Sequence, residues 1–249
     1  MTPPPVALVT GSGKRRIGWH VADALARRGH AVVVHYHTSA AEAEEAATHF
    51  RTHGVPAITF RADLKEEEQV RKLFEAALGH FGRLDVLVNC AAVWREKRLE
   101  EVTARDVCEH FETNVLGTFL CAREAGLAMV RQAEGGCIVN LGDWAEVRPY
   151  TDYAAYFATK GAIPTLTRSL AVELGTRNPR VRVNCILPGP VLLPREMPEE
   201  RRRQVIEATL VKREGQPENI AQAVLFFLDN DFVTGVCLPV DGGRSIYAN

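Results

Sequence analysis

The sequence predicts an α/β fold, and two observations carry that prediction. Short runs rich in β-branched residues alternate with longer amphipathic runs along the 249 residues. The short runs are apolar almost throughout, as is typical of strands that are buried on both faces of a sheet. Alternating strands and helices favour a parallel sheet with helices on both faces. Since no internal repeat or linker divides the chain, we expect a single Rossmann-type, doubly wound domain over residues 1–249, with about seven strands.

The strands and helices follow one another in that order along the chain. The expected strands are Val6–Thr10, Ala31–Tyr36, Ala57–Arg61, Asp85–Ala91, Gly136–Leu141, Val181–Leu187 and Gly235–Val240. The expected helices are Ile17–Arg28, Ala40–Thr52, Glu66–Phe81, Thr103–Gln132, Tyr153–Leu174 and Pro217–Leu228. Ser39 before Ala-Ala-Glu42 predicts a capping box at the second helix. Pro164 lies inside the fifth helix, where a proline costs about 3 kcal/mol unless the helix accommodates it.

Residues 188–215 interrupt the alternation with a proline-rich and charged excursion. It follows a strand, and in an open α/β sheet the ligand crevice lies outside the carboxyl ends of the strands. We expect this segment to cover a bound substrate, with an ordinary surface insertion as the alternative. Its run Arg201–Arg203 alternates with glutamates and indicates a solvated helical face.

Composition excludes several classes of protein. The formal net charge of −1 gives no general attraction to nucleic acid or to an anionic membrane. The six cysteines are scattered without a CxxC pair, which favours free thiols in a reducing compartment, and no metal site is expected. No apolar run approaches the ~20 residues of a membrane span, and the N-terminus lacks a basic n-region. We therefore expect a soluble, cytoplasmic protein.

The first turn, Thr10 to Gly18, has the features of a phosphate-binding turn. Its glycines, Gly11 among them, permit close backbone approach, and the helix that begins at Ile17 offers free N–H groups to a pyrophosphate. Such a turn is informative mainly because it follows the first strand and opens a helix. The basic residues inside it are interpreted as anion ligands, with three solvated charges as the alternative: Lys14, Arg15 and Arg16.

The end of the second strand indicates which nicotinamide cofactor is preferred. An NAD site usually places an acidic residue there to hold the ribose 2′-hydroxyl. This chain has no carboxylate at that point and offers imidazole and hydroxyl donors instead, in the order His35, Tyr36, His37, Thr38, Ser39. Together with the basic first turn, this favours NADP(H) over NAD(H).

These motifs resemble the short-chain dehydrogenase/reductase superfamily over essentially the whole chain. They are Thr10-Gly11 to Gly18, Asp63-Leu64, Asn89 to Ala92, Asn114, Tyr156-x-x-x-Lys160, Pro188-Gly189 and Val240 to Gly243. The resemblance implies a nicotinamide-dependent oxidoreductase, usually a homotetramer or homodimer, whose small-molecule substrate lies beside the cofactor. It assigns further cofactor contacts to Asp63, Leu64, Asn89, Cys90, Ala91, Pro188, Gly189 and Val191.

Within the superfamily the sequence is most similar to pteridine reductases. The segment from His35 to Ala43, the basic first turn and Asp143 carry this likeness. Most of the superfamily has serine thirteen residues before the catalytic tyrosine, whereas pteridine reductases have aspartate, as here. The sequence departs from their pattern at Thr38, where they have arginine, and its first turn is one residue longer than is usual in the family.

Three tyrosines precede Lys160, and spacing distinguishes them. Tyr156 stands four residues before the lysine, on the same helix face, where an ammonium group would lower the phenol pKa from its ordinary ~10. Tyr153 stands seven before it, the spacing used by enoyl reductases of the superfamily. We expect Tyr156 to be the proton donor and Tyr153 to line the substrate pocket, while Tyr150 belongs to a loop.

Four further residues complete the predicted site. A carboxyl at Asp143 can donate a proton if its pKa is raised, and it can pair with a heterocycle; the alternative is a structural acceptor. The resemblance places Trp94 where pteridine reductases stack the pterin, although it could simply cover the rim of the sheet. Trp144 could line the same cavity, and Asn114 would hold a water that relays protons to Lys160.

Three functions follow from these residues. The first is an NADPH-dependent, pteridine-reductase-like enzyme that transfers hydride to C=N or C=O. The second is a carbonyl reductase, such as a 3-oxoacyl-[acyl carrier protein] reductase, because a fold does not fix a substrate. The third is a non-catalytic NADP-binding sensor, which would be expected to lack Tyr156 or Lys160, and both are present.

Overall fold

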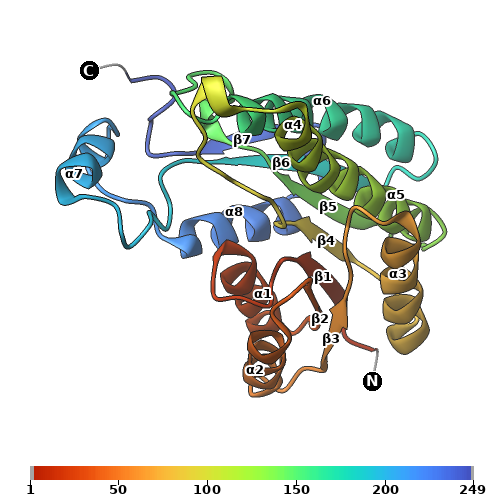
Figure 1. The fold of residues 1–249 in the computed structure, drawn as a ribbon. Helices are drawn as coiled ribbons and strands as arrows, with labels where there is room; N and C mark the ends of the chain where they lie inside the picture. Colours follow the sequence, from red (N-terminus) through yellow and green to blue (C-terminus); the bar gives the residue numbers. More distant parts are fainter. Residues whose placement is uncertain (1–2, 248–249) are drawn as a thin grey trace.

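The computed structural model describes residues 3–247 and contains the predicted parallel sheet. Its strand order is β3-β2-β1-β4-β5-β6-β7, and every neighbouring pair is parallel. The strands are β1 Val6–Thr10, β2 Ala31–Tyr36, β3 Ala57–Arg61, β4 Val86–Asn89, β5 Gly136–Leu141, β6 Val181–Pro188 and β7 Cys237–Val240 (Figure 1). The predicted fold class is confirmed.

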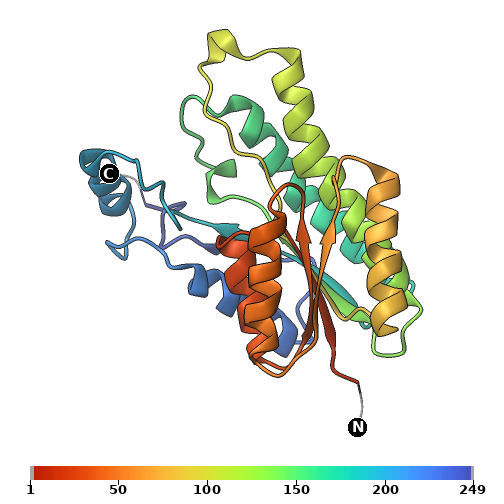
Figure 2. The same cartoon turned by 60° about the horizontal axis from the view of Figure 1, so that its bottom comes forward.

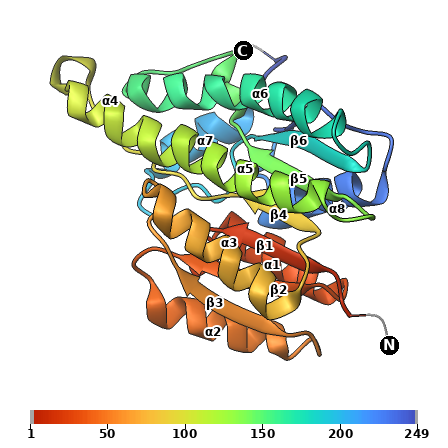
Figure 3. The same ribbon diagram turned by 90° about the vertical axis from the view of Figure 1, so that its right-hand side faces the viewer.

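Helices cover both faces of the sheet. They are α1 Ile17–Arg27, α2 Ala40–Arg51, α3 Glu67–Phe81, α4 Ala104–Phe111, α5 Gly117–Val130, α6 Ala154–Gly175, α7 Glu199–Glu207 and α8 Pro217–Asp229. Helices α1, α2 and α8 pack on one face, and Figure 2 shows α1 and α2 side by side in front of the strands. Helices α3, α5 and α6 lie side by side across the other face (Figure 3).

The strand sequences are apolar throughout because each strand supplies two cores. In β2, Val32 and Val34 face the core under α1, α2 and α8, whereas Ala31 and Val33 face the core under α3, α5 and α6. Successive side chains of a strand point to opposite faces, so a two-sided sheet needs apolar residues at every position. The free energy of burial on both faces stabilises this arrangement.

The predicted helix over residues 103–132 is wrong in one respect. Two α-helices, α4 and α5, are joined by a π-helical turn over Glu112–Leu116. A π turn accommodates one extra residue inside an otherwise continuous helix, and such turns are frequent at functional sites. Asn114 lies within this turn and is buried.

Two local predictions at helices had different outcomes. The capping box at Ser39 is wrong: its side chain makes no cap hydrogen bond to α2, and its Oγ faces Gly13 of the first turn instead. Pro164 does lie in the interior of α6, where it is buried. The α6 helix therefore continues through the proline.

All seven strands bring their carboxyl ends to the same edge, and the order of the strands reverses direction between β1 and β4. Ligand crevices of open α/β sheets lie at such a switch point. The excursion after β6 closes at its base through a bridge between Val191 and Gly215, and its helix α7 stands apart from the sheet (Figure 1). Among residues 3–247, no helix is long and apolar enough to cross a membrane.

Candidate active site

The turn after β1 forms a tight backbone cradle. Gly11 has φ +67°, and a Cβ on it would lie 3.1 Å from Ala91 Cα. A Cβ on Gly18 would lie 2.9 Å from the Gly11 carbonyl oxygen. Arg16 is the N-cap of α1 and makes no side-chain cap hydrogen bond, so the first N–H groups of the helix are left for a ligand. This is the geometry in which a helix N-terminus binds a pyrophosphate.

His35 supports this cradle from inside and is not a phosphate ligand. Its Nδ1 accepts a 3.0 Å hydrogen bond from the Gly11 N–H, and its Nε2 lies 3.1 Å from the Ala62 carbonyl oxygen, to which it donates. Burial lowers the pKa of His35 to about 4, so the ring is neutral. The expectation that His35 would bind the cofactor phosphate is wrong, because both of its nitrogens already have partners.

Other predicted groups of this region, in the first turn and in the loop after β2, are exposed. Lys14, Arg15, His37 and Thr38 are exposed, and the Arg15 guanidinium lies 4.8 Å from the centre of the Trp19 ring. A residue that the sequence reading missed joins them: Arg61, the last residue of β3, is exposed and donates from Nε to the His37 carbonyl oxygen at 3.2 Å.

Arg61 could have been found from the sheet register. Tyr36 and Arg61 are directly paired residues at the ends of β2 and β3. An arginine at the end of the third strand therefore reaches the loop after the second strand, where the sequence has Thr38 instead of arginine. A side chain from a neighbouring strand thus places a guanidinium in this region.

The ends of β1 and β4 are tied together at the switch point. Thr10 Oγ1 accepts hydrogen bonds of 3.0 Å from both Cys90 N–H and Ala91 N–H, which ends β4 earlier than predicted. Asn89 donates to Asn140 Oδ1 at 2.9 Å. Asp63 accepts from the Lys65 N–H at 3.1 Å, and its carboxylate lies 3.7 Å from His37 Nε2. Thr10 is thus joined to Cys90 and Ala91, Asp63 lies beside His37, and Leu64 is buried. Contacts of these residues with the cofactor stay a prediction.

Asp143, Tyr156 and Lys160 form one polar group, in which Tyr156 and Lys160 are buried and Asp143 is partly buried. The Tyr156 hydroxyl donates to Asp143 Oδ2 at 2.8 Å, and the other oxygen of Asp143 accepts from the Ala145 N–H at 2.8 Å. Lys160 Nζ donates to the Leu141 carbonyl oxygen at 2.7 Å and lies 5.8 Å from the centre of the Tyr156 ring. The loop after β5 supplies the aspartate, and α6 supplies the other two residues.

The pKa of Tyr156 is raised, contrary to expectation. Burial and then the Asp143 carboxylate raise the pKa of the phenol well above its ordinary value. Burial also raises the pKa of Asp143 and lowers the pKa of Lys160. Lys160 donates to a carbonyl oxygen and does not lower the Tyr156 pKa, whereas the Asp143 carboxylate adds to the effect of burial. The raised pKa of Asp143 is the condition under which its carboxyl could donate a proton, and that role stays a prediction.

A second acid near Asp143 was missed. Glu146 is partly buried, and burial together with the charge of Asp143 raises its pKa to about 7. It lies in the short helical turn Trp144–Glu146 that Asp143 caps. Only its position three residues after Asp143 could have indicated it.

The side chain of Asn114 fixes two neighbouring segments. Its Oδ1 accepts from the Val93 N–H at 2.8 Å, and its Nδ2 donates to the Val93 carbonyl and to Thr159 Oγ1, each at 3.0 Å. It thereby ties the loop that carries Trp94 to helix α6. A role in proton relay stays a prediction, since both amide hydrogens are held by protein oxygens.

Aromatic side chains line the space around Tyr156. Trp94, 44% exposed, stacks on Tyr153 with ring centres 5.0 Å apart and planes within 10°. The Tyr153 hydroxyl donates to Glu96 Oε2 at 2.8 Å and not to Lys160. Trp144 stacks with Tyr150 at 6.4 Å. Tyr153 is therefore turned away from the lysine, which favours Tyr156 as the proton donor.

The segment after β6 and the C-terminal segment are packed together. Gly189 N–H donates to the Val240 carbonyl at 3.0 Å, and a Cβ on this glycine would lie 2.4 Å from Asp241 Cα. The Arg244 guanidinium lies 5.0 Å from the centre of the Trp144 ring and donates to the Ala208 carbonyl at 3.0 Å. Arg244 therefore connects residues 188–215 to the aromatic side chains of the site.

Comparison with known proteins agrees with this geometry. The profile of a family described as Enoyl-(Acyl carrier protein) reductase matches residues 11–245. A short chain dehydrogenase/reductase of Aspergillus novofumigatus is 33% identical over 257 residues, covering 96% of this chain and 95% of the relative. The chain belongs to the short-chain dehydrogenase/reductase family.

Other members of the family differ in their named activities. A 3-oxoacyl-[acyl-carrier-protein] reductase of Staphylococcus aureus is 32% identical over 241 residues, covering 95% of this chain and 96% of the relative. The crystal structure of acetoin dehydrogenase from Enterobacter cloacae superposes with a TM-score of 0.88 at 32% identity, covering 98% of each chain. The chain is similar to both.

As a short-chain dehydrogenase/reductase, the protein is an NAD(P)-dependent oxidoreductase, and its residues fit a dinucleotide. The cradle of Gly11 and Gly18 admits no Cβ without a shift of the neighbouring backbone, so only glycine leaves room for a close approach. The exposed basic residues of the first turn could neutralise a pyrophosphate bound at this cradle, and Lys160 lies beside Tyr156.

Proposed function

We propose that the protein is an NADPH-dependent reductase of nitrogen heterocycles, in the manner of pteridine reductases. The observation that carries this proposal is the 2.8 Å hydrogen bond from Tyr156 to a partly buried aspartate, Asp143, at the position where most of the family has serine. A bound NADPH supplies the hydride. The residues of this chain supply the proton and hold the substrate.

A carboxyl group does what a serine hydroxyl cannot. When protonated it donates a hydrogen to a ring nitrogen, and when ionised it accepts one from a ring N–H. Burial raises the pKa of Asp143, which favours the protonated form. A substrate with C=N bonds needs a proton on nitrogen as hydride reaches carbon, so the pair Asp143 and Tyr156 suits it better than a simple ketone.

The surroundings of the pair suit a flat substrate. Trp94 is half-exposed and stacked on Tyr153, and Trp144 lies next to Asp143 in sequence. Planar aromatic faces favour stacking with a planar heterocycle. We propose that residues 188–215, which Arg244 connects to Trp144, cover the substrate once it is bound.

Preference for NADP(H) is part of the proposal. Residues 35–39 contain no carboxylate, and Lys14, Arg15 and Arg61 are exposed in the surrounding segments. A 2′-phosphate is stabilised by arginine, which binds phosphate through paired N–H donors. Pteridine reductases have arginine at the position of Thr38. In this chain Arg61, which donates to the His37 carbonyl oxygen, would supply the guanidinium instead.

A second candidate is a carbonyl reductase acting on a small ketone or a 3-oxoacyl thioester. The family members named above, a 3-oxoacyl-[acyl-carrier-protein] reductase and an acetoin dehydrogenase, favour it. In that case Asp143 would act only as the hydrogen-bond acceptor of Tyr156.

Steady-state oxidation of NADPH tests the two candidates. The purified protein is assayed with dihydrobiopterin, acetoin and a 3-oxoacyl thioester, beside an Asp143→Ser variant. If the pterin is turned over and Asp143→Ser loses that activity, the proposed function holds. If only a carbonyl compound is reduced, and Asp143→Ser reduces it faster, the second candidate replaces it.

We further propose that the enzyme works as a homotetramer or homodimer. Phe111, Leu116 and Phe119, on the joined helices α4 and α5, are each more than a third exposed, which is unusual for large apolar side chains so close together. Sedimentation analysis of the purified protein measures its state directly, and a monomer at micromolar concentration would contradict the proposal.

A further inference from the structure

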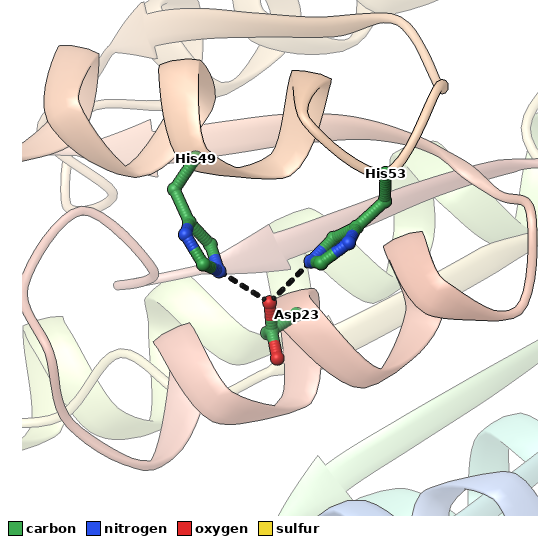
Figure 4. Close-up of side chains that lie close together, drawn as sticks. All are labelled: Asp23, His49 and His53. Carbon is green, nitrogen blue, oxygen red and sulfur yellow. Dashed lines mark hydrogen bonds and ion pairs between the residues drawn. The ribbon is translucent and has the colours of Figure 1, made fainter.

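We propose that Asp23, His49 and His53 bind a divalent transition metal ion, with Zn²⁺ as the best match. Asp23 lies on α1, His49 on the last turn of α2, and His53 in the turn that follows α2 (Figure 4). These helices cover one face of the sheet, and α6, which carries Tyr156, covers the other. The proposed site is therefore separate from the site of hydride transfer.

Three potential ligand atoms converge on one point. His49 Nε2 lies 2.7 Å and His53 Nε2 lies 2.9 Å from the same oxygen, Asp23 Oδ1. All three ligand atoms lie within 4.8 Å of one another. In a tetrahedral zinc site with bonds of ~2.0–2.1 Å, ligand atoms are about 3.3 Å apart. Small side-chain rotations suffice to open these contacts and admit the ion.

The spacing of the histidines produces this convergence. Residues four apart share one face of a helix, and the backbone continues α2 by one turn through the hydrogen bond from the His53 N–H to the Phe50 carbonyl at 3.0 Å. Both rings consequently point across the gap to α1. The scattered cysteines predict no metal site, whereas the pair His49 and His53, four residues apart, is the signal that could have indicated one.

The neighbouring side chains hold the ligands in position. Arg27 donates from Nε to the other oxygen, Asp23 Oδ2, at 2.8 Å, so the carboxylate is oriented while Oδ1 faces the histidines. The Trp19 ring lies against His49, with centres 5.0 Å apart. Partners that orient metal ligands in this way raise the affinity of a site.

The chemistry of the ligands selects the type of ion. Two imidazole nitrogens and one carboxylate oxygen suit Zn²⁺, and also Co²⁺ and Ni²⁺, better than Mg²⁺ or Ca²⁺, which prefer oxygen ligands alone. An ionised carboxylate only accepts hydrogen bonds, so each Nε2 carries a hydrogen that the ion would replace. His49 is 40% exposed, which leaves the remaining coordination position open to water.

The ion would connect α1 to α2 and so stabilise the folded state. A ligand that binds only the folded protein raises its melting temperature. Without metal, the same residues are a hydrogen-bonded contact between the two helices. That alternative predicts no response to Zn²⁺ at these positions.

Titration calorimetry with Zn²⁺ and melting curves distinguish the two. The full-length protein is compared with His49→Gln, His53→Gln and Asp23→Asn, and with His80→Gln as a control, because His80 is exposed on α3 and outside the cluster. We expect one Zn²⁺ per chain and a higher melting temperature with Zn²⁺ in the wild type and in the control. Each cluster variant should bind at least ~10-fold more weakly.

Absorption spectra of the Co²⁺-loaded protein separate this site from the free cysteines. The proposed ligands contain no sulfur, so we expect d–d bands without the intense near-ultraviolet band of a cobalt thiolate. The proposal is overturned if neither ion binds, if the thiolate band accompanies binding, or if His49→Gln and His53→Gln both bind as tightly as His80→Gln. Circular dichroism of each variant checks that a loss of binding is not a loss of folding.

Discussion

Tyr156 donates its hydroxyl hydrogen to Asp143, whereas Tyr153, three residues earlier, donates to Glu96. Tyr153 is the N-cap of α6 and Tyr156 lies in its first turn, yet their hydroxyl groups bind different carboxylates. Tyr156 is thereby tied to the carboxyl group in the site, and Tyr153 supports the ring of Trp94. This difference predicts which tyrosine is needed for proton transfer.

We expect Tyr156→Phe to lower kcat/KM by about 10²–10⁴-fold, the usual contribution of a general acid. Tyr153→Phe keeps the ring that stacks on Trp94 and loses only the hydrogen bond to Glu96, so it should change KM more than kcat. Steady-state kinetics with whichever compound the NADPH-oxidation assay shows to be turned over measures both. If Tyr153→Phe abolishes turnover and Tyr156→Phe does not, the enoyl-reductase spacing governs this site.

Arg61 is expected to determine cofactor preference. Hydrogen bonds to charged groups contribute about 1.5–3 kcal/mol, so Arg61→Ala should raise the KM for NADPH by about 10–100-fold. The KM for NADH should stay close to that of the wild type, because NADH lacks the 2′-phosphate. Arg71→Ala is the matched control, since Arg71 is an exposed arginine paired with Glu68 on α3. Equal losses with both cofactors would show that Arg61 only supports the loop.

A buried chain of hydrogen bonds joins β4, β5 and α6. Asn89 donates to Asn140 Oδ1 at 2.9 Å, and Asn140 donates to Thr167 Oγ1 at 3.0 Å. Asn140→Ala leaves two buried partners unpaired, at about 1–3 kcal/mol each, so the free energy of unfolding should fall by about 2–6 kcal/mol. Urea denaturation measures this loss.

Thr167→Val tests whether that loss comes from the hydrogen bonds. It removes the other end of the pair, so its effect and that of Asn140→Ala should be less than additive in the double variant. Strict additivity would show that Asn140 stabilises the protein through packing alone.

His35 predicts a specific dependence of stability on pH. Its pKa is about 4 in the folded protein, because of burial, and ~6.5 in the unfolded chain. Between these values the unfolded state binds the additional proton, so stability falls as pH falls from about 6.5 to 4, by about 3 kcal/mol in total.

Replacing His35 removes this contribution. Urea denaturation of His35→Gln between pH 4 and 7.5 should show a shallower pH dependence than the wild type, although His35→Gln is less stable at pH 7. The exposed residue His80 provides the control variant, His80→Gln, whose curve should follow that of the wild type. An unchanged slope in His35→Gln would mean that His35 has the same pKa in the folded and unfolded states, which would contradict this prediction.

Sheet and helices were predictable because each strand carries its own signal. The strands are buried on both sides and hence apolar throughout, and the helix bounds mostly agree within two residues. The π turn at Glu112–Leu116 was not predictable, because the extra residue there is stabilised by the contacts of Asn114 to Val93 and Thr159, which are distant in sequence. The hydrophobic periodicity of the sequence predicts only the helices on either side of this turn.

The positions of site residues were predictable where their spacing along one helix or loop determines which side chains meet. Hydrogen-bond partners from segments distant in sequence were not predictable. Asp143, Tyr156 and Lys160 meet as their positions on one loop and one helix imply. The direction of the Tyr156 pKa was wrong because a four-residue spacing does not show that Lys160 binds Leu141. His35 was misassigned for a similar reason: its partners, Gly11 and Ala62, lie in other segments.

The π turn between α4 and α5 also affects how the protein tolerates deletion. The wider turn holds one extra residue, so removing one residue from Glu112–Leu116 would restore a regular helix and leave α4 and α5 nearly in their present positions. The local backbone that directs Asn114 toward Val93 and Thr159 would be lost. In a sequence alignment, a one-residue gap at this point would therefore mark a protein that must secure the loop of Trp94 by other means.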